Sequence, residues 1–406
     1  MTTERSASSE PALFAVIFDI FRVFLKLGLT SFGGPIAHLG YFQNEFVIRR
    51  KWLDAQAFAD LVALCQFLPG PASSQVGFAL GLSRGGFLGG CAAWLGFTLP
   101  SALALIAFAH FSGSIEGTIS TGILHGLKIV AVAVVAQAVW GMARTLCPDR
   151  QRATIALVAL LIVIAVSGAT RQIAAIGLGA IAGLVFCRSE PSAIGGRLSF
   201  SLSRRTGLLA CTVFFLLLAG LPVLAALVQN HAFALMDAFY RSGALVFGGG
   251  HVVLPLLQSE VVQTGWVDNN AFLTGYGAAQ AIPGPLFTFA AYLGAVMQAQ
   301  PKGLLGATIC LVAIFLPGLL LLIGMLPFWD DFRRLEPAQA VMRGVNAAVV
   351  GLLGAALYTP LWTSTIHRDS DFGLALAGFV LLTVWKVPPW FIVIISASGA
   401  ALLETF

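Results

Sequence analysis

Long apolar stretches separated by short polar segments dominate the chain. Four of them contain no Asp, Glu, Lys or Arg: 86–115, 153–170, 208–228 and 303–327. Two more, 118–143 and 342–363, carry one basic residue each. A bilayer core is crossed by about 20 residues of helix, so these lengths are typical of membrane spans. The pattern predicts an all-α protein that crosses a membrane many times.

Four segments are interrupted in ways that predict their shape. Segments 153–186 and 371–403 are each divided by a few polar residues or prolines, and we expect tight helical hairpins there. Segments 54–83 and 268–298 are each divided by Pro-Gly-Pro. Proline removes a backbone donor and the residue before it resists helix, so both segments should be broken helices.

The same motifs occur twice at a nearly constant spacing. Phe32-Gly33-Gly34 recurs as Phe247-Gly248-Gly249, and Pro69-Gly70-Pro71 recurs as Pro283-Gly284-Pro285. Collinear single-residue pairs extend the match: Lys26/Arg241, Gln43/Gln258, Glu45/Glu260, Trp52/Trp266, Asp54/Asp268, Gln66/Gln280, Gly126/Gly344 and Val132/Val350. This order predicts a duplicated chain.

The duplication predicts four parts: a tail (1–11), a first half (12–187), a basic linker with one connecting helix (188–230), and a second half (231–406). Basic residues fall on opposite loops of the two halves. Residues 35–52 contain Arg49, Arg50 and Lys51, whereas the corresponding loop of the second half has no Lys or Arg. By the positive-inside rule the halves are therefore inverted, with the N-terminus in the cytoplasm. Inverted repeats with helices broken at mid-membrane are typical of secondary transporters.

The helix breaks are the first candidates for a binding site. Irregular backbone at membrane depth must line protein or a water-filled cavity, and a helix start after a break favours anions. Close helix packing at the glycines, or a plain turn outside the membrane, are the alternatives. The candidate substrate contacts at the breaks are Ser31, Gly33, Gly34, Gln66, Gly70, Ser73, Ser74, Gly248, Gly249, Gln280, Gly284 and Thr288.

Charged residues repeated in both halves are the next candidates. Lys26 and Arg241 form a basic pair within apolar helices, which suits a dianion. Alternatively, both reach the lipid headgroups, or Arg241 pairs with Asp237 one turn away. Glu45 and Glu260 are candidates for proton coupling, and a solvated interfacial position is the alternative.

Composition narrows the class of protein. Of 406 residues 58% are hydrophobic and only 10% charged, with a mean hydropathy of +0.89. A soluble enzyme or a nucleic-acid binder would carry far more charge. The six cysteines are dispersed without metal-ligand spacing, and no phosphate-loop or hydrolase motif occurs, so we expect no metal, cofactor or catalytic residue. His38, His125 and His251 lack a counterpart in the other half and are assigned no role. Asp54 and Asp268 are expected to cap helices.

These residues identify a family resemblance. Phe32-Gly33-Gly34-Pro35, Trp52-Leu53 and Pro69-Gly70-Pro71, with their weaker second copies, resemble the chromate ion transporter family in its long two-domain form. The resemblance implies a multi-pass protein of a bacterial inner membrane that exports chromate, confers chromate resistance and has sulfate as a competing dianion. Ser73-Ser74-Gln75 corresponds to Phe287-Thr288-Phe289, so the polar contacts are expected to lie mainly in the first half.

Charge favours export. A dianion leaving a negative-inside cell gains about 4.6 kcal/mol at 100 mV, so the membrane potential, with or without a proton gradient, can drive it. A proton-coupled oxyanion importer, an anion channel and an intramembrane enzyme are the competing hypotheses. The expected partners are the oxyanion and the bilayer, and not nucleic acid. A glycine stripe at Gly81, Gly85 and Gly89 could pack helices within one chain or between two copies in a homodimer.

Overall fold

The computed structural model describes residues 13–112, 118–166, 170–188, 202–228, 230–332 and 335–405, and every regular element among them is helical. The expected tail and most of the basic linker lie outside the described residues. Five helical stretches are long and apolar enough to cross a membrane: Ala72–Phe111, Thr121–Leu146, Arg204–Val228, Gly303–Phe332 and Glu336–Thr365. The predicted all-α, multi-pass membrane architecture is confirmed.

The first half runs from α1 to α7. Its elements are α1 (Leu13–Thr30), α2 (Gly34–Phe42), η1 (Gln43–Arg49), α3 (Ala55–Phe67), α4 (Ala72–Ser112), α5 (Thr118–Leu146), α6 (Arg150–Ala165) and α7 (Thr170–Phe186). Asp54 begins α3 as predicted, because its side chain accepts the Ala57 N–H at 2.8 Å. Helices α6 and α7 form the first predicted hairpin.

Helix α4 consists of two helical pieces. Gly85 and Gly86 depart from helical dihedral angles, and the chain folds back there. Gly81 and Gly89 then face each other so closely that a Cβ on either would clash with the backbone of the other, and Gly85 lies against Ile20 of α1. The glycine stripe therefore packs helices within the chain.

The second half repeats this order after the connecting helix α8 (Arg204–Val228). It comprises α9 (His231–Ala244), η2 (Gly250–Val252), α10 (Val253–Leu257), η3 (Gln258–Val262), α11 (Asn269–Ala281), η4 (Leu286–Thr288), α12 (Phe289–Val296), α13 (Gly303–Met325), η5 (Leu326–Phe328), α14 (Trp329–Phe332), α15 (Glu336–Ala356), η6 (Leu357–Trp362), α16 (Thr363–Thr365), α17 (Asp369–Thr383) and α18 (Pro389–Thr405). By order and motif, α9 corresponds to α1, α11 to α3, α13 to the second piece of α4, and α15 to α5. Helices α17 and α18 form the second predicted hairpin.

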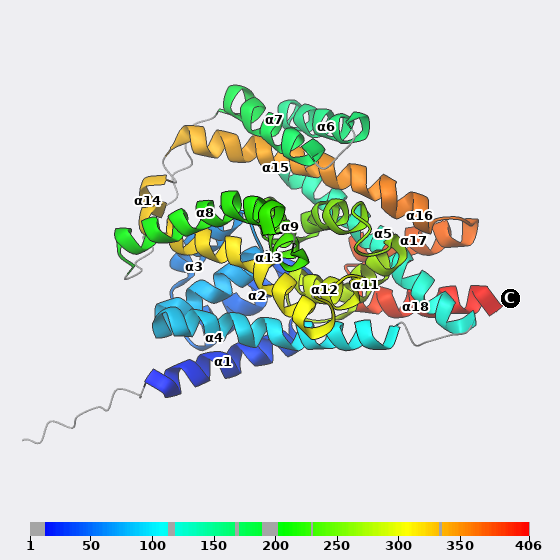
Figure 1. Cartoon of the computed structure of the whole chain (residues 1–406), viewed down its shortest axis with the longest axis horizontal. Coiled ribbons are helices and arrows are strands. Elements are labelled where there is room, and N and C mark those ends of the chain that lie inside the picture. The colour runs from blue at the N-terminus through cyan, green and yellow to red at the C-terminus, as the bar shows by residue number, and fades with distance from the viewer. Residues whose placement is uncertain are drawn as a thin grey trace, which may run out of the picture.

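Each hairpin packs on the long helix of the opposite half. Helix α15 lies along α6 and α7, while α5 lies along α17 and α18 (Figure 1). Small residues allow both crossings, as they do in many membrane helix pairs. Gly126 of α5 touches the backbone of α18 at Ser396, and Gly344 of α15 touches the backbone of α7 at Gly179 and Gly183. The two halves are thus interlocked.

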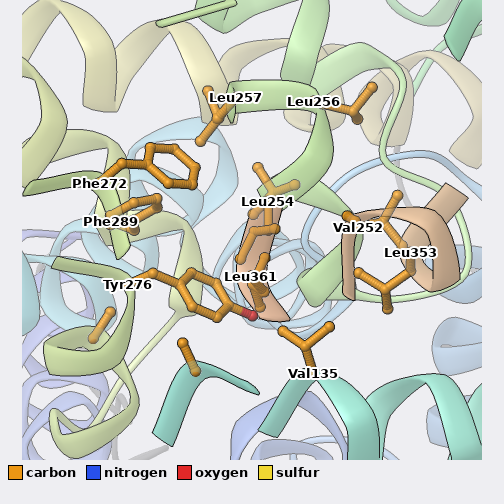
Figure 2. Packing of buried hydrophobic residues seen from close by; sticks show 14 of the residues in the cluster. Val135, Val252, Leu254, Leu256, Leu257, Phe272, Tyr276, Phe289, Leu353 and Leu361 are labelled. Atoms are coloured by element: carbon orange, nitrogen blue, oxygen red, sulfur yellow. The ribbon is translucent and has the colours of Figure 1, made fainter. Parts of the chain in front are cut away.

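The main hydrophobic core is also shared between the halves. Figure 2 shows Phe272 and Tyr276 of α11 near Leu254 of α10 and Leu361 of η6, with Val135 of α5 beside them. All five side chains are fully buried, and only Val135 comes from the first half. The packing that holds α11 in place therefore depends on a helix of the other half.

Candidate functional site

The first Pro-Gly-Pro separates α3 from α4, as predicted. Helix α3 ends at Phe67 because Leu68, which precedes Pro69, has extended dihedral angles (φ −77°, ψ 148°). Gly70 has φ +118°, in the left-handed region that favours glycine. Helix α4 begins two residues later, so Ser73 and Ser74 lie in its first turn.

The second Pro-Gly-Pro repeats this geometry between α11 and α12. Ile282 is extended (φ −98°, ψ 134°) before Pro283, and Gly284 has φ +105°. The chain then makes one turn of tighter helix, η4, before α12. Thr288 closes that turn, because its hydroxyl donates to the Pro285 carbonyl at 2.7 Å.

The two double-glycine segments are breaks of a second kind. Helix α1 ends before Gly33 and Gly34, which have φ +100° and +76°. Helix α9 likewise ends before Gly248 and Gly249, with φ +73° and +151°. Each motif therefore interrupts regular helix in both halves.

Two hydrogen bonds tie the breaks of opposite halves together. The Gly70 N–H donates to the Val246 carbonyl at 2.8 Å, and the Gly284 N–H donates to the Ser31 carbonyl at 3.0 Å. Val246 and Ser31 are corresponding residues, each directly before the Phe of a double-glycine break. A Cβ placed on Gly250 would lie 3.5 Å from Pro35 Cγ, so the two double-glycine breaks also meet. All four breaks converge at the interface between the halves.

Each Pro-Gly-Pro is braced by the proline-bearing helix of the opposite half. A Cβ on Gly70 would lie 3.0 Å from Gly318 Cα in α13, and one on Gly284 would lie 2.8 Å from Ser101 Oγ in α4. The Gln75 side chain joins the first pair, because its Nε2 donates to the carbonyls of Pro69 and Gly318 at 3.0 and 2.9 Å.

Buried hydroxyls surround the breaks of the first half. Ser31, Ser74 and Thr98 are at most 2% exposed, and their hydroxyl groups have no hydrogen-bond partner among the described residues. An unpaired buried polar group costs about 1–3 kcal/mol. Ser31 precedes the double-glycine break, Ser74 follows the Pro-Gly-Pro, and Thr98 adjoins Phe97 beside Gly284, so this region is suited to a ligand that accepts hydrogen bonds.

His38 connects the two breaks of the first half, and sequence reasoning missed it. The ring is 1% exposed; its Nδ1 lies 3.3 Å from Ser73 Oγ and its Nε2 lies 3.2 Å from the Ser31 carbonyl. The residue at its position in the second half is Val253, so a search for repeated residues discards it. Its position four residues after Gly34, in the helix that follows a break, could have indicated that it lies near the candidate site.

The same region carries different polar groups in the second half. Gln280 Nε2 is buried without a partner among the described residues, and Tyr276 pairs with His251, with the hydroxyl 2.7 Å from Nδ1. Gln66, which corresponds to Gln280, is exposed on α3. The polar groups thus differ between the halves, although the backbone breaks match.

The repeated basic pair occupies two different environments. Arg241 Nη2 donates to Asp237 Oδ2 at 2.8 Å and to Glu260 Oε2 at 3.2 Å. The Lys26 side chain is exposed on α1. The charge of Arg241 is therefore already balanced by two carboxylates, whereas the Lys26 side chain points away from the protein interior.

The repeated carboxylates lie outside the five membrane-crossing helices. Glu45 in η1 binds Arg49 and Arg50. Burial alone would raise the pKa of Glu45, but these guanidinium groups outweigh it and lower the pKa. The pKa of Glu260 is raised, because burial outweighs the nearby Arg241. Of the two, Glu260 is the carboxylate that takes up a proton at the higher pH.

Comparison with known proteins identifies the family of this chain. A family model described as Chromate transporter matches residues 18–184 and 233–402. The chain belongs to the chromate transporter family. A chromate transport protein of Pseudomonas aeruginosa is 30% identical over 394 residues, which cover 94% of this chain and 91% of the relative. No solved structure matches the chain.

Two other relatives extend the comparison within the chromate transporter family. A probable chromate transport protein of Synechococcus elongatus is 28% identical over 94% of both chains. A chromate transport protein of Cupriavidus metallidurans is 25% identical over 91% of this chain and 88% of its own. Each range matched by the chromate transporter model contains one Phe-Gly-Gly break and one Pro-Gly-Pro.

Proposed function

We propose that this protein is a secondary transporter that exports chromate across the inner membrane, with sulfate as a competing dianion, and so confers chromate resistance. The observation that carries the proposal is the convergence of four helix breaks, tied by the Gly70–Val246 and Gly284–Ser31 hydrogen bonds. Breaks at corresponding positions of repeated halves hold the substrate in many secondary transporters. The relatives from P. aeruginosa and C. metallidurans are named as chromate transport proteins.

The chemistry of the first-half breaks suits a tetrahedral oxyanion. The hydroxyls of Ser31, Ser74 and Thr98 can donate to its oxygens, and the first turn of α4 supplies the positive end of a helix dipole. Lys26 and Arg241 are the proposed basic contacts from the two halves; Lys26 is exposed on α1, and Arg241 also pairs with Asp237 and Glu260. The other proposed contacts are Gly33, Gly34, Gln66, Gly70, Ser73, Gly248, Gly249, Gln280, Gly284 and Thr288.

The membrane potential is the proposed driving force. Moving a dianion out through 100 mV releases about 4.6 kcal/mol, which favours export without ATP. The inverted orientation of the halves, inferred from the loop charges, suits alternating access to one central site.

A proton-coupled oxyanion importer is the second candidate, because Glu260 is a partly buried carboxylate that pairs with Arg241 near the double-glycine break of the second half. In that case Glu260 would carry the proton, and the lowered pKa of Glu45 makes that residue the poorer carrier. Uptake into cells should then rise as the pH falls, and Glu260→Gln should abolish this dependence. Export driven by the potential alone, unchanged in Glu260→Gln, would exclude the importer.

Transport in inverted membrane vesicles tests the proposal. We expect radiolabelled chromate to accumulate under an inside-positive potential and excess sulfate to block it. The double variant Ser31→Ala/Ser74→Ala should lower the initial rate about tenfold or more, since each hydrogen bond to a charged group contributes about 1.5–3 kcal/mol. Lys26→Ala and Arg241→Ala should also lower the rate, because each removes a positive charge.

Ser83→Ala is the matched control. Its hydroxyl also lies on α4, but it donates to the Leu80 carbonyl near the other end of the first helical piece. We expect its rate to stay within about twofold of the unmodified protein. Absence of chromate accumulation under any imposed gradient would contradict the proposed function.

A further inference from the structure

A polar pocket lies at the ends of three helices, away from the four breaks. It has a volume of about 420 Å³ and is lined from the starts of α5, α11 and α17. Lys128 and His125 of α5, Asn270 and Thr274 of α11, and Arg368 before α17 contribute to its wall. Pockets that hold small molecules have volumes of about 300–1,000 Å³, so there is room for an oxyanion with some of its water.

Lys128 is the central cation of this pocket. It is the only Asp, Glu, Lys or Arg in the 118–143 stretch, and its side chain is partly buried. Its Nζ donates to Asn270 Oδ1 at 3.2 Å, and an ammonium group has three donors. A charge held in an apolar helix is costly and marks a functional position by default.

The carboxylates near Lys128 are engaged by other donors. Asp371 Oδ2 accepts the backbone N–H groups of His367 and Arg368, both at 3.1 Å, and its Oδ1 lies 3.0 Å from His125 Nε2. Asp268 caps α11 by accepting the N–H groups of its first turn. The acidic groups thus hold the helix starts in place, and Lys128, which bonds Asn270 through one of its three N–H groups, is the side chain that can face an anion.

The duplication shows that this cation is specific to one half. Lys128 lies two residues after Gly126, and the residue two positions after its counterpart Gly344 is the neutral Asn346. Asn346 lies near the double-glycine break, with its Oδ1 3.4 Å from where a Cβ of Gly248 would stand. The positive charge is therefore not repeated, and neither is the α5–α11 packing beside it, because α15 does not pack on α3 in the same way among the described residues.

We propose that this pocket binds a tetrahedral oxyanion dianion through Lys128, as a second site on the outer side of the transporter. The inference rests on the proposed transport of oxyanions. The loops before α5 and α11 contain no Lys or Arg, so the charge pattern places these helix starts outside. An anion released from the breaks meets a cation there, whereas the corresponding position of the second half, Asn346, carries no charge.

Protection of an introduced thiol tests the site. Thr121 lines the pocket at its exposed rim, and no cysteine lines it. In purified Thr121→Cys protein, sodium sulfate should slow labelling by N-ethylmaleimide more than sodium chloride of equal ionic strength. Sulfate is the probe because chromate oxidises thiols. Lys128→Gln should raise the half-protecting sulfate concentration about tenfold or more, as expected for a lost charged hydrogen bond.

Two further variants make the test specific. Lys128→Arg keeps the charge, so its half-protecting sulfate concentration should stay within about threefold of that of the Thr121→Cys protein. Lys302→Gln removes an exposed lysine outside the pocket and should leave this concentration unchanged. Equal protection by sulfate and chloride, or equal protection with and without Lys128, would overturn the proposal. Protection in a protein that moves no chromate in vesicles would support the anion site and contradict the export function.

Discussion

Two separate constraints exclude a side chain at Gly70. Its φ of +118° is a value that residues with a Cβ rarely adopt, and a Cβ there would lie 3.0 Å from Gly318 of the opposite half. Gly284 is limited in the same two ways, by its φ of +105° and by Ser101. The repeated glycines thus fix both the turn and the approach of the other half, and the motif alone predicts only the turn.

Gly70→Ala should therefore lower both stability and transport. Strained backbone of this kind costs about 1–3 kcal/mol, and the contact with α13 adds to it. We expect a lower midpoint of thermal unfolding in detergent and a chromate uptake rate reduced at least about tenfold. Gly40→Ala is the control, because Gly40 is helical and a Cβ would meet nothing within 4 Å. A normal uptake rate in Gly70→Ala would show that the break tolerates movement.

For the helices, the sequence predicted features that depend on neighbouring residues better than it predicted contacts between distant segments. The helix ends at Phe67 and Ala281, and the caps at Asp54 and Asp268, follow from residues within a few positions, so the sequence was enough. The position of His38 depends on contacts with Ser31 and Ser73, which only the folded chain brings together.

The crossing of α7 and α15 offers a test of the packing. Gly344→Leu places a large side chain against the α7 backbone at Gly179 and Gly183. Overpacking costs about 1–3 kcal/mol, so the midpoint of thermal unfolding should fall. Gly177→Leu, on the open face of α7, should leave it nearly unchanged. Equal midpoints for the two variants would show that this crossing contributes little to stability.

In the whole molecule, neither half is a separate packing unit. The hairpin α6–α7 covers α15 and the hairpin α17–α18 covers α5, so each half completes the other. The duplication predicted two similar halves but not this exchange, because repeated sequence gives the order of helices and not which copy they contact.

Two co-expressed fragments, 1–200 and 201–406, should therefore assemble. We expect an affinity tag on the first fragment to recover the second from detergent extracts in near-equal amounts. Either fragment expressed alone should aggregate, because the faces of α5 and α15 that receive the opposite hairpin are then uncovered. Two fragments that are each stable and monodisperse alone, and do not bind each other, would contradict the interlocked arrangement.

The exchanged hairpins also bear on how the chain is made. Helix α7 ends at Phe186 and its partner α15 ends at Ala356, so roughly 170 residues separate their completion. At about 5–20 residues per second, synthesis of that interval takes on the order of 10–30 s. During this time the glycine face of α7 waits in the bilayer without its partner. The first half is therefore inserted before its packing is complete. The ribosome synthesises most of the second half before the interface between the halves can form.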